Sequence, residues 1–256
     1  MKNPAGVTLL ITHYNRSRSL ERLLKKLREL TCHFDEIIVS DDASRPEHIE
    51  RLRELQKEYS FRLLTTPVNR GLGNNINKGQ DAVTTPYTLY VQEDFLPTDA
   101  FPEGLRSALE IMETRKDIDM IRLYVGLEYP DVKPYKFGFS EMIFRLSRPG
   151  SAKFFYYSDT PHLRRRDFFQ KFGRYAEGVV QVKGEKYMGM AFLQAHGKAM
   201  LTDKNDLFVH ENPDEEPSTQ DYSAFNRMRA KIPEPIFDAL WTVKKTVEYL
   251  FIRYRR

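Results

Sequence analysis

Two adjacent carboxylates, Glu93 and Asp94, stand at the end of an apolar, β-branched run in the stretch "LYVQEDFL". Neighbouring carboxylates repel one another, so they favour either a bound cation or a solvated loop. Their hard oxygen atoms suit Mg²⁺ or Mn²⁺, which typically bridge protein carboxylates to phosphate oxygens. The pair is therefore either a metal-phosphate site or a polar loop before the next helix.

A second acidic pair, Asp41 and Asp42, follows the apolar run "EIIVS" in the same way. These carboxylates either initiate a turn or accept hydrogen bonds from a pyrimidine N–H or a ribose hydroxyl. The segment "NRGLGNNINKG" adds Gly71, Gly73 and Gly79, which permit unusual turns and close approach of the backbone to a ligand. A glycine-rich loop alone is a weak indication of phosphate binding.

Strands that alternate with helices must position these residues. "VTLLIT", "EIIVS", "FRLLTT" and "YTLYV" are typical of buried strands, and leucines at helical spacing follow the first of them. This alternation predicts an α/β fold, with a parallel, right-handed wound sheet covered by helices on both faces. Ligands of such sheets bind outside the carboxyl ends of the strands. Residues 12–16, 40–44, 69–73 and 92–94 should therefore gather along one rim.

The second half of the chain is less regular. "DMIRLYVG", "EMIFRLS" and "KFFYYSD" predict further strands, and helical segments are expected near residues 165–172 and 185–196. "KAMLTDKNDLFVHE" predicts a strand followed by a polar loop. We expect one domain over residues 1–210, followed over 211–256 by a Pro-rich, acidic linker and a basic amphipathic helix.

Composition narrows the class of protein. The chain has 256 residues, of which 41% are apolar and 30% charged, an ordinary mixture for a soluble domain with a real core. A net charge of +4 is too small to indicate nucleic acid as a partner. The single Cys32 fits a reducing compartment. No stretch reaches the roughly 18 apolar residues of a membrane span, so we expect a cytoplasmic protein.

Taken in order, "ITHYNR", "VSDDAS", "NRGLGNNINKG" and "YVQEDF" resemble the successive motifs of family 2 glycosyltransferases, which have the GT-A fold of the nucleotide-diphospho-sugar transferases. Each motif is weak by itself, but four in the right order and spacing are specific. The likeness extends over residues 7–210. It implies a Rossmann-like, mostly parallel sheet with a C-terminal helical extension, and a nucleotide-sugar donor as substrate.

The resemblance also assigns residues to the nucleotide. The implied contacts are Thr12, Tyr14 and Asn15 at the base, Asp41 and Asp42 at uracil or ribose, and Asn69 and Gly71 in the loop beside the nucleotide.

The "QED" segment stands at the family's DXD position, which binds the metal ion and the diphosphate. Gln92 replaces the first acid there, so the resemblance implies Asp94 as the principal ligand of Mn²⁺ or Mg²⁺. Glu93 would turn toward ribose or a phosphate-bound water. His210 lies where such enzymes often have a histidine that completes the metal shell; the alternative is an ordinary polar residue at a strand end.

An inverting transfer needs a carboxylate that deprotonates the acceptor hydroxyl as it attacks the anomeric carbon. The segment "VKGEKYMGMAFL" lies where the family usually has an acidic pair whose second member is this base. Here the pair is Glu185 and Lys186, a departure from the family pattern. Glu185 is the candidate base, and Asp159 in "YYSDTPH" is the reserve.

The tail "ALWTVKKTVEYLFIRYRR" combines an apolar, aromatic face with basic residues. This combination is typical of an interfacial helix at an anionic membrane. A helix docked on the catalytic domain or on a partner subunit, as in a homo-oligomer, needs the same apolar face. Both alternatives remain open, and the first would place the protein peripherally at the inner face of the membrane.

The resemblance thus implies a metal-dependent, inverting glycosyltransferase. It would move a sugar from a nucleotide-diphosphate donor, UDP-linked, to a saccharide or lipid-linked acceptor in cell-surface polysaccharide or glycolipid synthesis. A sugar-phosphate nucleotidyltransferase is one alternative, but it would normally have a glycine-rich phosphate loop, and "THYNRSRS" contains no glycine. A catalytically impaired homologue acting as a binding subunit is the other, kept open by Gln92 and Lys186.

Overall fold

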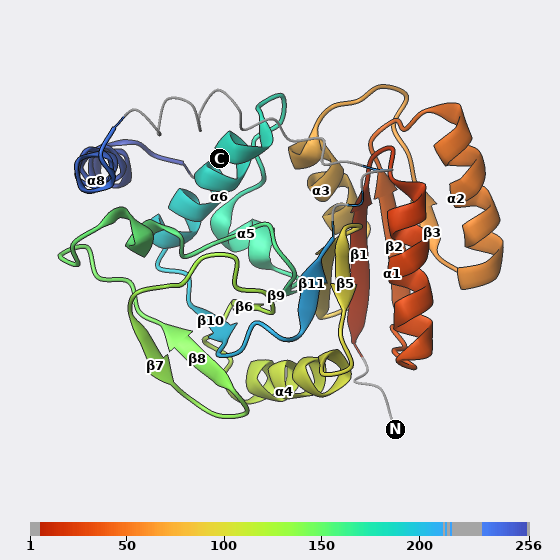
Figure 1. Ribbon diagram of the computed structural model, residues 1–256, viewed down its shortest axis with the longest axis horizontal. Helices are drawn as coiled ribbons and strands as arrows, with labels where there is room; N and C mark the ends of the chain where they lie inside the picture. The colour runs from red at the N-terminus through yellow and green to blue at the C-terminus, as the bar shows by residue number, and fades with distance from the viewer. Residues whose placement is uncertain (1–5, 212, 214–215, 217–231, 255–256) are drawn as a thin grey trace.

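The computed structural model describes residues 6–211, 213, 216 and 232–254. Its centre is a nine-stranded sheet in the order β3-β2-β1-β4-β9-β6-β10-β8-β7 (Figure 1). The strands of this sheet are β1 (Val7–His13), β2 (Glu36–Asp41), β3 (Arg62–Leu64), β4 (Tyr87–Gln92), β6 (Met120–Arg122), β7 (Val132–Pro134), β8 (Phe139–Met142), β9 (His162–Arg165) and β10 (Ala199–Thr202). A separate antiparallel pair joins β5 (Phe95–Pro97) to β11 (Phe208–His210).

The sheet is mostly parallel. Strands β3, β2, β1, β4, β6 and β10 run in one direction, whereas β9 and β8 run against it. Because the chain passes from β1 outward to β2 and β3 and then returns to β4 on the other side of β1, the strand order reverses between β1 and β4. Such a switch point leaves a crevice at the carboxyl ends of the two strands, where ligands of wound sheets bind.

Helices cover both faces of the sheet, as the alternating sequence predicts (Figure 1). The helices are α1 (Ser17–Glu29), α2 (Pro46–Tyr59), α3 (Leu72–Asp81), α4 (Phe101–Thr114), α5 (Phe168–Phe172), α6 (Gln181–Gln194) and α8 (Glu234–Phe251), with a 3₁₀ turn η1 (Ser151–Phe154).

Successive residues of β1 supply two different cores. Leu9 packs with Leu52 of α2 and the residues of α1 and α4, whereas Leu10 packs with Ile76 of α3 and Phe192 of α6. All of these side chains are buried. Because side chains alternate along a strand, one fully apolar strand can hold a helical layer on each face. The predicted two-sided α/β fold is therefore confirmed.

The chain after β6 departs from two of the expectations. "KFFYYSD" is not a strand: its aromatic residues, including Tyr156 and Tyr157, follow the 3₁₀ turn η1 and pack into the core beneath α5 and α6. Two consecutive buried residues, Tyr156 and Tyr157, do not fit the alternation of a strand with one exposed face. Strand β9 instead forms from the polar sequence "HLRR", which was not predicted as a strand. Its Arg164 is buried and donates a hydrogen bond to the side-chain carbonyl of Gln80 at 2.7 Å.

Most of the predicted linker lies outside the described residues. Within it, Glu216 is buried and its carboxylate accepts hydrogen bonds from the backbone N–H groups of Arg18 and Ser19 at 3.0 and 2.8 Å. An acidic group at this point satisfies the free N–H groups at the start of α1 and interacts favourably with the helix dipole.

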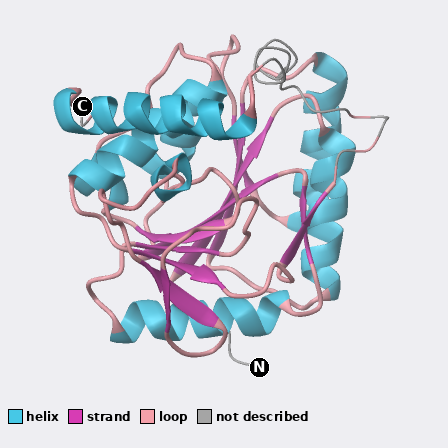
Figure 2. Ribbon diagram, turned by 60° about the vertical axis from the view of Figure 1, so that its left-hand side comes forward, coloured by secondary structure: helices cyan, strands magenta, loops and turns pink. Residues whose placement is uncertain are grey.

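Helix α8 forms at the predicted place and packs back onto the domain. Figures 1 and 2 show it at the opposite end of the molecule from α4. Asp238 accepts hydrogen bonds from the backbone and hydroxyl of Ser151, and Gln194 of α6 donates to the Tyr249 carbonyl at 2.7 Å. Among the described residues, no helix combines the length and the apolar character required to cross a bilayer.

Candidate functional site

A cavity of about 270 Å³ lies at the switch point between β1 and β4. The two strands are in register here, with Thr12 opposite Gln92. The residues expected from the sequence that line this cavity are Thr12, Tyr14, Asp42, Asn69, Gly71, Glu93 and Asp94. The predicted convergence of polar segments at one rim is present in the structure.

Asp42 organises the glycine-containing loop at this cavity. Its two carboxylate oxygens accept hydrogen bonds from the backbone N–H groups of Arg70 and Gly71, at 2.9 and 2.7 Å. Gly71 has a φ of +84°, a conformation that costs a residue with a Cβ atom. The carboxylate of Asp42 therefore holds the loop in the shape that faces the cavity.

Asp41 and Asn15 do not line the cavity. Asp41 is fully buried, with His13 Nδ1 at 2.7 Å from one oxygen and the Ser44 N–H at 3.0 Å from the other. Burial alone would raise the pKa of Asp41, but the hydrogen bonds from His13 and Ser44 outweigh it and lower the pKa. Asn15, at φ 55°, accepts the N–H of Arg45. Both residues join the loop after β1 to the loop after β2.

Asp94, which lines this cavity, contacts His210. Strand β11 pairs with β5 so that His210 lies opposite Phe95, and the imidazole stacks on the Phe95 ring at 4.7 Å between centroids. His210 Nε2 is 3.2 Å from Asp94 Oδ2. The sequence could place both residues at strand ends, but only the pairing of β5 with β11 brings them together.

Arg16, which sequence reasoning missed, contacts the same carboxylate. Its Nη1 donates to Asp94 Oδ2 at 2.7 Å and lies 3.9 Å from Glu93. Burial would raise the pKa of Asp94, but His210 and Arg16 together lower it. The available signal was a cationic residue directly after the "THYN" motif at the end of β1. Arg16 lines the cavity and offers positive charge to a diphosphate.

Asp94 of the acidic pair fits a divalent cation. Asp94 Oδ1 is buried and has no hydrogen-bond partner in the described structure, so one hard oxygen is available. The described residues contain no group of three His, Cys, Asp or Glu side chains arranged around a common point. In enzymes that act on phosphate-containing substrates, Mg²⁺ is commonly bound by one or two protein carboxylates. Its other ligands are water and the substrate phosphates. Asp94 with His210 matches that arrangement.

Glu93 differs from its neighbour. Burial, reinforced by the charge of Asp94, raises the pKa of Glu93 to about 8. A carboxyl group with this pKa keeps its proton at neutral pH and can donate a hydrogen bond. Glu93 is therefore suited to contact an oxygen of ribose or phosphate, the role that the resemblance implies for it.

The side chain of Gln92 is hydrogen-bonded to the protein backbone. Its amide Nε2 donates to the backbone carbonyl of Asp159 at 3.2 Å. The side chain thus braces the loop that carries the reserve base, and this contact accounts for an amide at a position where the family usually has an acid.

A larger cavity of about 730 Å³ adjoins the first one. Gln92, Asp94 and Gln181 line both of them. The larger cavity is closed on one side by Trp241 and Lys245 of α8. The part of a ligand that lies beside Asp94 in the first cavity would therefore face the second cavity.

Glu185 lies in the larger cavity, near the start of α6. Its Oε1 accepts hydrogen bonds from the Ser158 hydroxyl and the Asp159 N–H, at 2.9 and 3.0 Å. The next residue, Lys186, instead reaches α8 and pairs with Glu248 at 2.9 Å. Because Lys186 pairs with Glu248, it does not pair with Glu185, the carboxylate that α6 supplies to this cavity.

Asp159 also lines this cavity. It is buried and hydrogen-bonded to the hydroxyl of Tyr175. Burial, followed by repulsion from Glu185, raises the pKa of Asp159 well above its usual range. A carboxyl group that holds its proton at neutral pH is a poor general base, so this geometry favours Glu185.

Comparison with known proteins shows the family of the chain and its fold. The solved structures that resemble it include Staphylococcus aureus TarS in complex with UDP-GlcNAc, with a TM-score of 0.61 and 13% identity over 96% of this chain and 71% of that one. The mannosyltransferase PcManGT from Pyrobaculum calidifontis, in complex with GDP-Man and Mn²⁺, has a TM-score of 0.58 and 15% identity over 98% and 71%. These likenesses establish a shared GT-A fold.

Curated relatives match a shorter segment. The poly-beta-1,6-N-acetyl-D-glucosamine synthase of Staphylococcus epidermidis is 28% identical over 97 residues, which are 38% of this chain and 24% of that protein. The match thus spans about a quarter of the relative's length. The model of glycosyl transferase family 2 matches residues 8–173, well over half of the chain. The chain is therefore a member of glycosyl transferase family 2.

Proposed function

We propose that this protein is a metal-dependent, inverting glycosyltransferase that moves a sugar from a UDP-linked donor to a saccharide or lipid-linked acceptor in cell-surface polysaccharide or glycolipid synthesis. The observation that carries this proposal is the junction of the two cavities at Asp94. The smaller, polar cavity suits a nucleotide diphosphate, and the larger one, with Glu185, suits an acceptor. The sugar would then lie between them.

The chain's own residues divide the work as follows. The loop held by Asp42 and the side chains of Thr12 and Tyr14 would bind the nucleoside, and Arg16 would face the diphosphate. Asp94 and His210 would hold Mn²⁺ or Mg²⁺, which when bound offsets the negative charge of a departing diphosphate.

Glu185 would take the proton of the acceptor hydroxyl. The hydroxyl oxygen forms a bond to the anomeric carbon as the bond to the diphosphate oxygen breaks, and attack from the opposite side inverts the configuration at that carbon. The hydrogen bonds from Ser158 and Asp159 keep one oxygen of Glu185 in place. This positioning leaves the other oxygen for the acceptor proton.

Three observations support an active glycosyltransferase with a nucleotide-sugar donor. The related structures were obtained with UDP-GlcNAc or GDP-Man, and one, glucosyl-3-phosphoglycerate synthase from Mycobacterium tuberculosis, with UDP and Mn²⁺. The curated relatives are named as synthases of an N-acetylglucosamine polymer. Gln92 and Lys186, the departures that favour an impaired homologue, each have a partner of their own: Gln92 donates to the Asp159 carbonyl and Lys186 pairs with Glu248.

A nucleotide panel tests this proposal. We expect UDP and UDP-sugars with Mn²⁺ to raise the melting temperature of the protein, because a ligand that binds only the folded state stabilises it. At a concentration about 100 times its Kd, a ligand adds about 2.7 kcal/mol to the free energy of unfolding. Slow, Mn²⁺-dependent hydrolysis of one UDP-sugar should accompany binding. A protein that ignores every nucleotide sugar and hydrolyses none would contradict the proposal.

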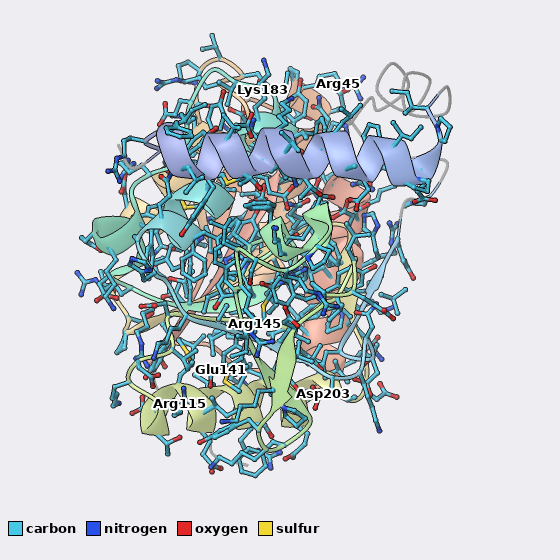
Figure 3. The ribbon with its side chains drawn as sticks, turned by 90° about the vertical axis from the view of Figure 1, so that its left-hand side faces the viewer. Arg45, Arg115, Glu141, Arg145, Lys183 and Asp203 are labelled. Carbon is cyan, nitrogen blue, oxygen red and sulfur yellow. The ribbon has the colours of Figure 1, made fainter. Side chains whose placement is uncertain are left out.

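We further propose that the outer face of α8 binds an anionic membrane. The exposed residues of that face are Ile236, Leu240, Val243, Val247, Leu250 and Phe251. Lys244 and Arg253 lie beside them. Figure 3 shows α8 at the front of the molecule, with no described element covering it. An exposed apolar stripe bordered by cations suits the interface of anionic lipids. Lys245, another basic residue of this tail, is instead buried.

Flotation with phosphatidylserine-containing vesicles tests the membrane proposal. We expect the protein to float with these vesicles and the double variant Val243→Asp, Leu250→Asp to remain in solution, since each buried aliphatic side chain contributes about 1.5–3 kcal/mol. Val132→Asp, at another exposed valine, is the control. A dimer in analytical ultracentrifugation that the double variant dissociates, without vesicle binding, would instead assign this face to a second copy of the chain.

A further inference from the structure

Arg122 is a buried cation at the larger cavity. It lies on β6, is 2% exposed and lines the cavity. Its Nη1 donates to the Phe155 carbonyl at 3.0 Å, while its Nε has no hydrogen-bond partner in the described structure. A buried guanidinium normally pairs with a carboxylate, because burying an isolated charge is costly. Within the described part of the chain, Arg122 forms no ion pair.

Lys245 of α8 approaches the same place from the other wall. It is 6% exposed and lines the larger cavity, and its Nζ lies 4.0 Å from the centroid of the Phe155 ring. The structure records no hydrogen bond or ion pair for this ammonium group among the described residues. Burial, the largest cause, lowers the pKa of Lys245 to about 8. Phe155 is therefore contacted by two cations for which the described structure gives no ion pair. The carboxylates whose charge acts on them from further away are Glu185 for both cations, with Glu248 and Asp238 for Lys245.

From this geometry we propose that Arg122 and Lys245 form an anion subsite in the acceptor cavity, which binds a phosphate or carboxylate group of the acceptor. The inference rests on the proposed function and adds a chemical class to its acceptor. A guanidinium group matches the oxygens of phosphate and carboxylate, and an ammonium group adds a second charge-assisted donor.

The other charged groups at this wall leave room for such an anion. Lys186 pairs with Glu248, and burial raises the pKa of Asp159 well above its usual range. The charge of Glu185 acts on both cations, but its hydrogen bonds come from Ser158 and Asp159. Asp238, which also acts on Lys245, is hydrogen-bonded to Ser151. An acceptor whose anionic group is bound by Arg122 and Lys245 would therefore place a neighbouring hydroxyl group toward Glu185 in the same cavity.

Inorganic phosphate is the probe for this subsite. Its binding to the full chain is measured by calorimetry while UDP and Mn²⁺ saturate the donor cavity. We expect phosphate to bind the protein, and Lys245→Met and Arg122→Met each to weaken binding about tenfold or more, the loss expected when a charge-assisted hydrogen bond is removed. Lys244→Met, next to Lys245 on the helix, should not change it. Acetate in place of phosphate distinguishes a carboxylate subsite from a phosphate subsite.

Lys245→Arg and the melting temperature separate binding from a structural role. The arginine variant should retain phosphate binding, and Lys245→Met should melt no lower than the original protein, because it removes a buried charge without a partner. Phosphate binding that is absent from the original protein, or unchanged in folded Lys245→Met, would overturn the subsite. If Arg122→Met does not fold, the two Lys245 variants decide the question. UDP binding, measured separately, reports on the donor site alone.

Discussion

Replacing Glu185 by glutamine is expected to lower the rate of sugar transfer by roughly 10²–10⁴-fold, the usual contribution of a positioned general base. Glutamine keeps the size of the side chain and can still accept the hydrogen bonds from Ser158 and Asp159, but it cannot take a proton at neutral pH. The affinity for UDP should be unchanged, because Glu185 lines the acceptor cavity and not the donor cavity.

The measurement is a single-turnover transfer assay beside a calorimetric titration with UDP. Glu103→Gln makes the same chemical change on exposed α4, where Glu103 pairs with Arg106, and should leave both quantities as they were. Full transfer activity in Glu185→Gln would remove Glu185 as the base. A second assay of Asp159→Asn would then show whether the reserve candidate takes the proton.

Replacing Asp94 by asparagine is expected to weaken Mn²⁺-dependent UDP binding by about 10- to 100-fold, the cost of losing a charged ligand. The substitution removes the negative charge at the buried Oδ1 atom while keeping the shape of the side chain. His210→Ala should have a smaller effect on the same quantity, because it leaves the carboxylate in place.

Calorimetry with UDP in Mn²⁺ and in EDTA measures this effect. Asp99→Asn, five residues along the chain and paired with Lys26 at the surface, is the matched control. Since Arg16 loses its close partner in Asp94→Asn, the melting temperature of the variant must be measured as well. UDP affinity that depends equally on Mn²⁺ in the original protein and in folded Asp94→Asn would exclude Asp94 as a metal ligand.

Much of the donor side was predictable because it follows from strand order. Thr12 lies near the end of β1, Asp42 and Asp94 follow β2 and β4, and Gly71 ends the loop from β3 to α3. Parallel strands of one wound sheet end at a common edge. Periodicity therefore places them together without knowledge of any contact. The pair Asp41 and Asp42 shows the limit of this reasoning. Asp41 is hydrogen-bonded to the buried His13, whereas Asp42 accepts the N–H of Gly71 in the loop before α3.

The acceptor side was less predictable because it depends on elements that are distant in the sequence. His210 reaches Asp94 across 116 residues, and only the pairing of β11 with β5 determines that contact. Lys186, the departure from the family pattern beside Glu185, pairs with Glu248 of α8, 62 residues further along the chain. Local patterns carry no information about such partners, because long-range packing selects them.

The sequence by itself determined the wound sheet, the family and the rim where the nucleotide residues gather, since the alternation of buried strands and helices leaves few ways to bury the apolar faces. Only the tertiary structure decided which carboxyl groups are charged and what faces the acceptor. The pKa values of Glu93 and Asp159 depend on burial and on neighbouring charge, and α8 contributes Trp241 and Lys245 to the lining of the larger cavity. Both are properties of the packed chain.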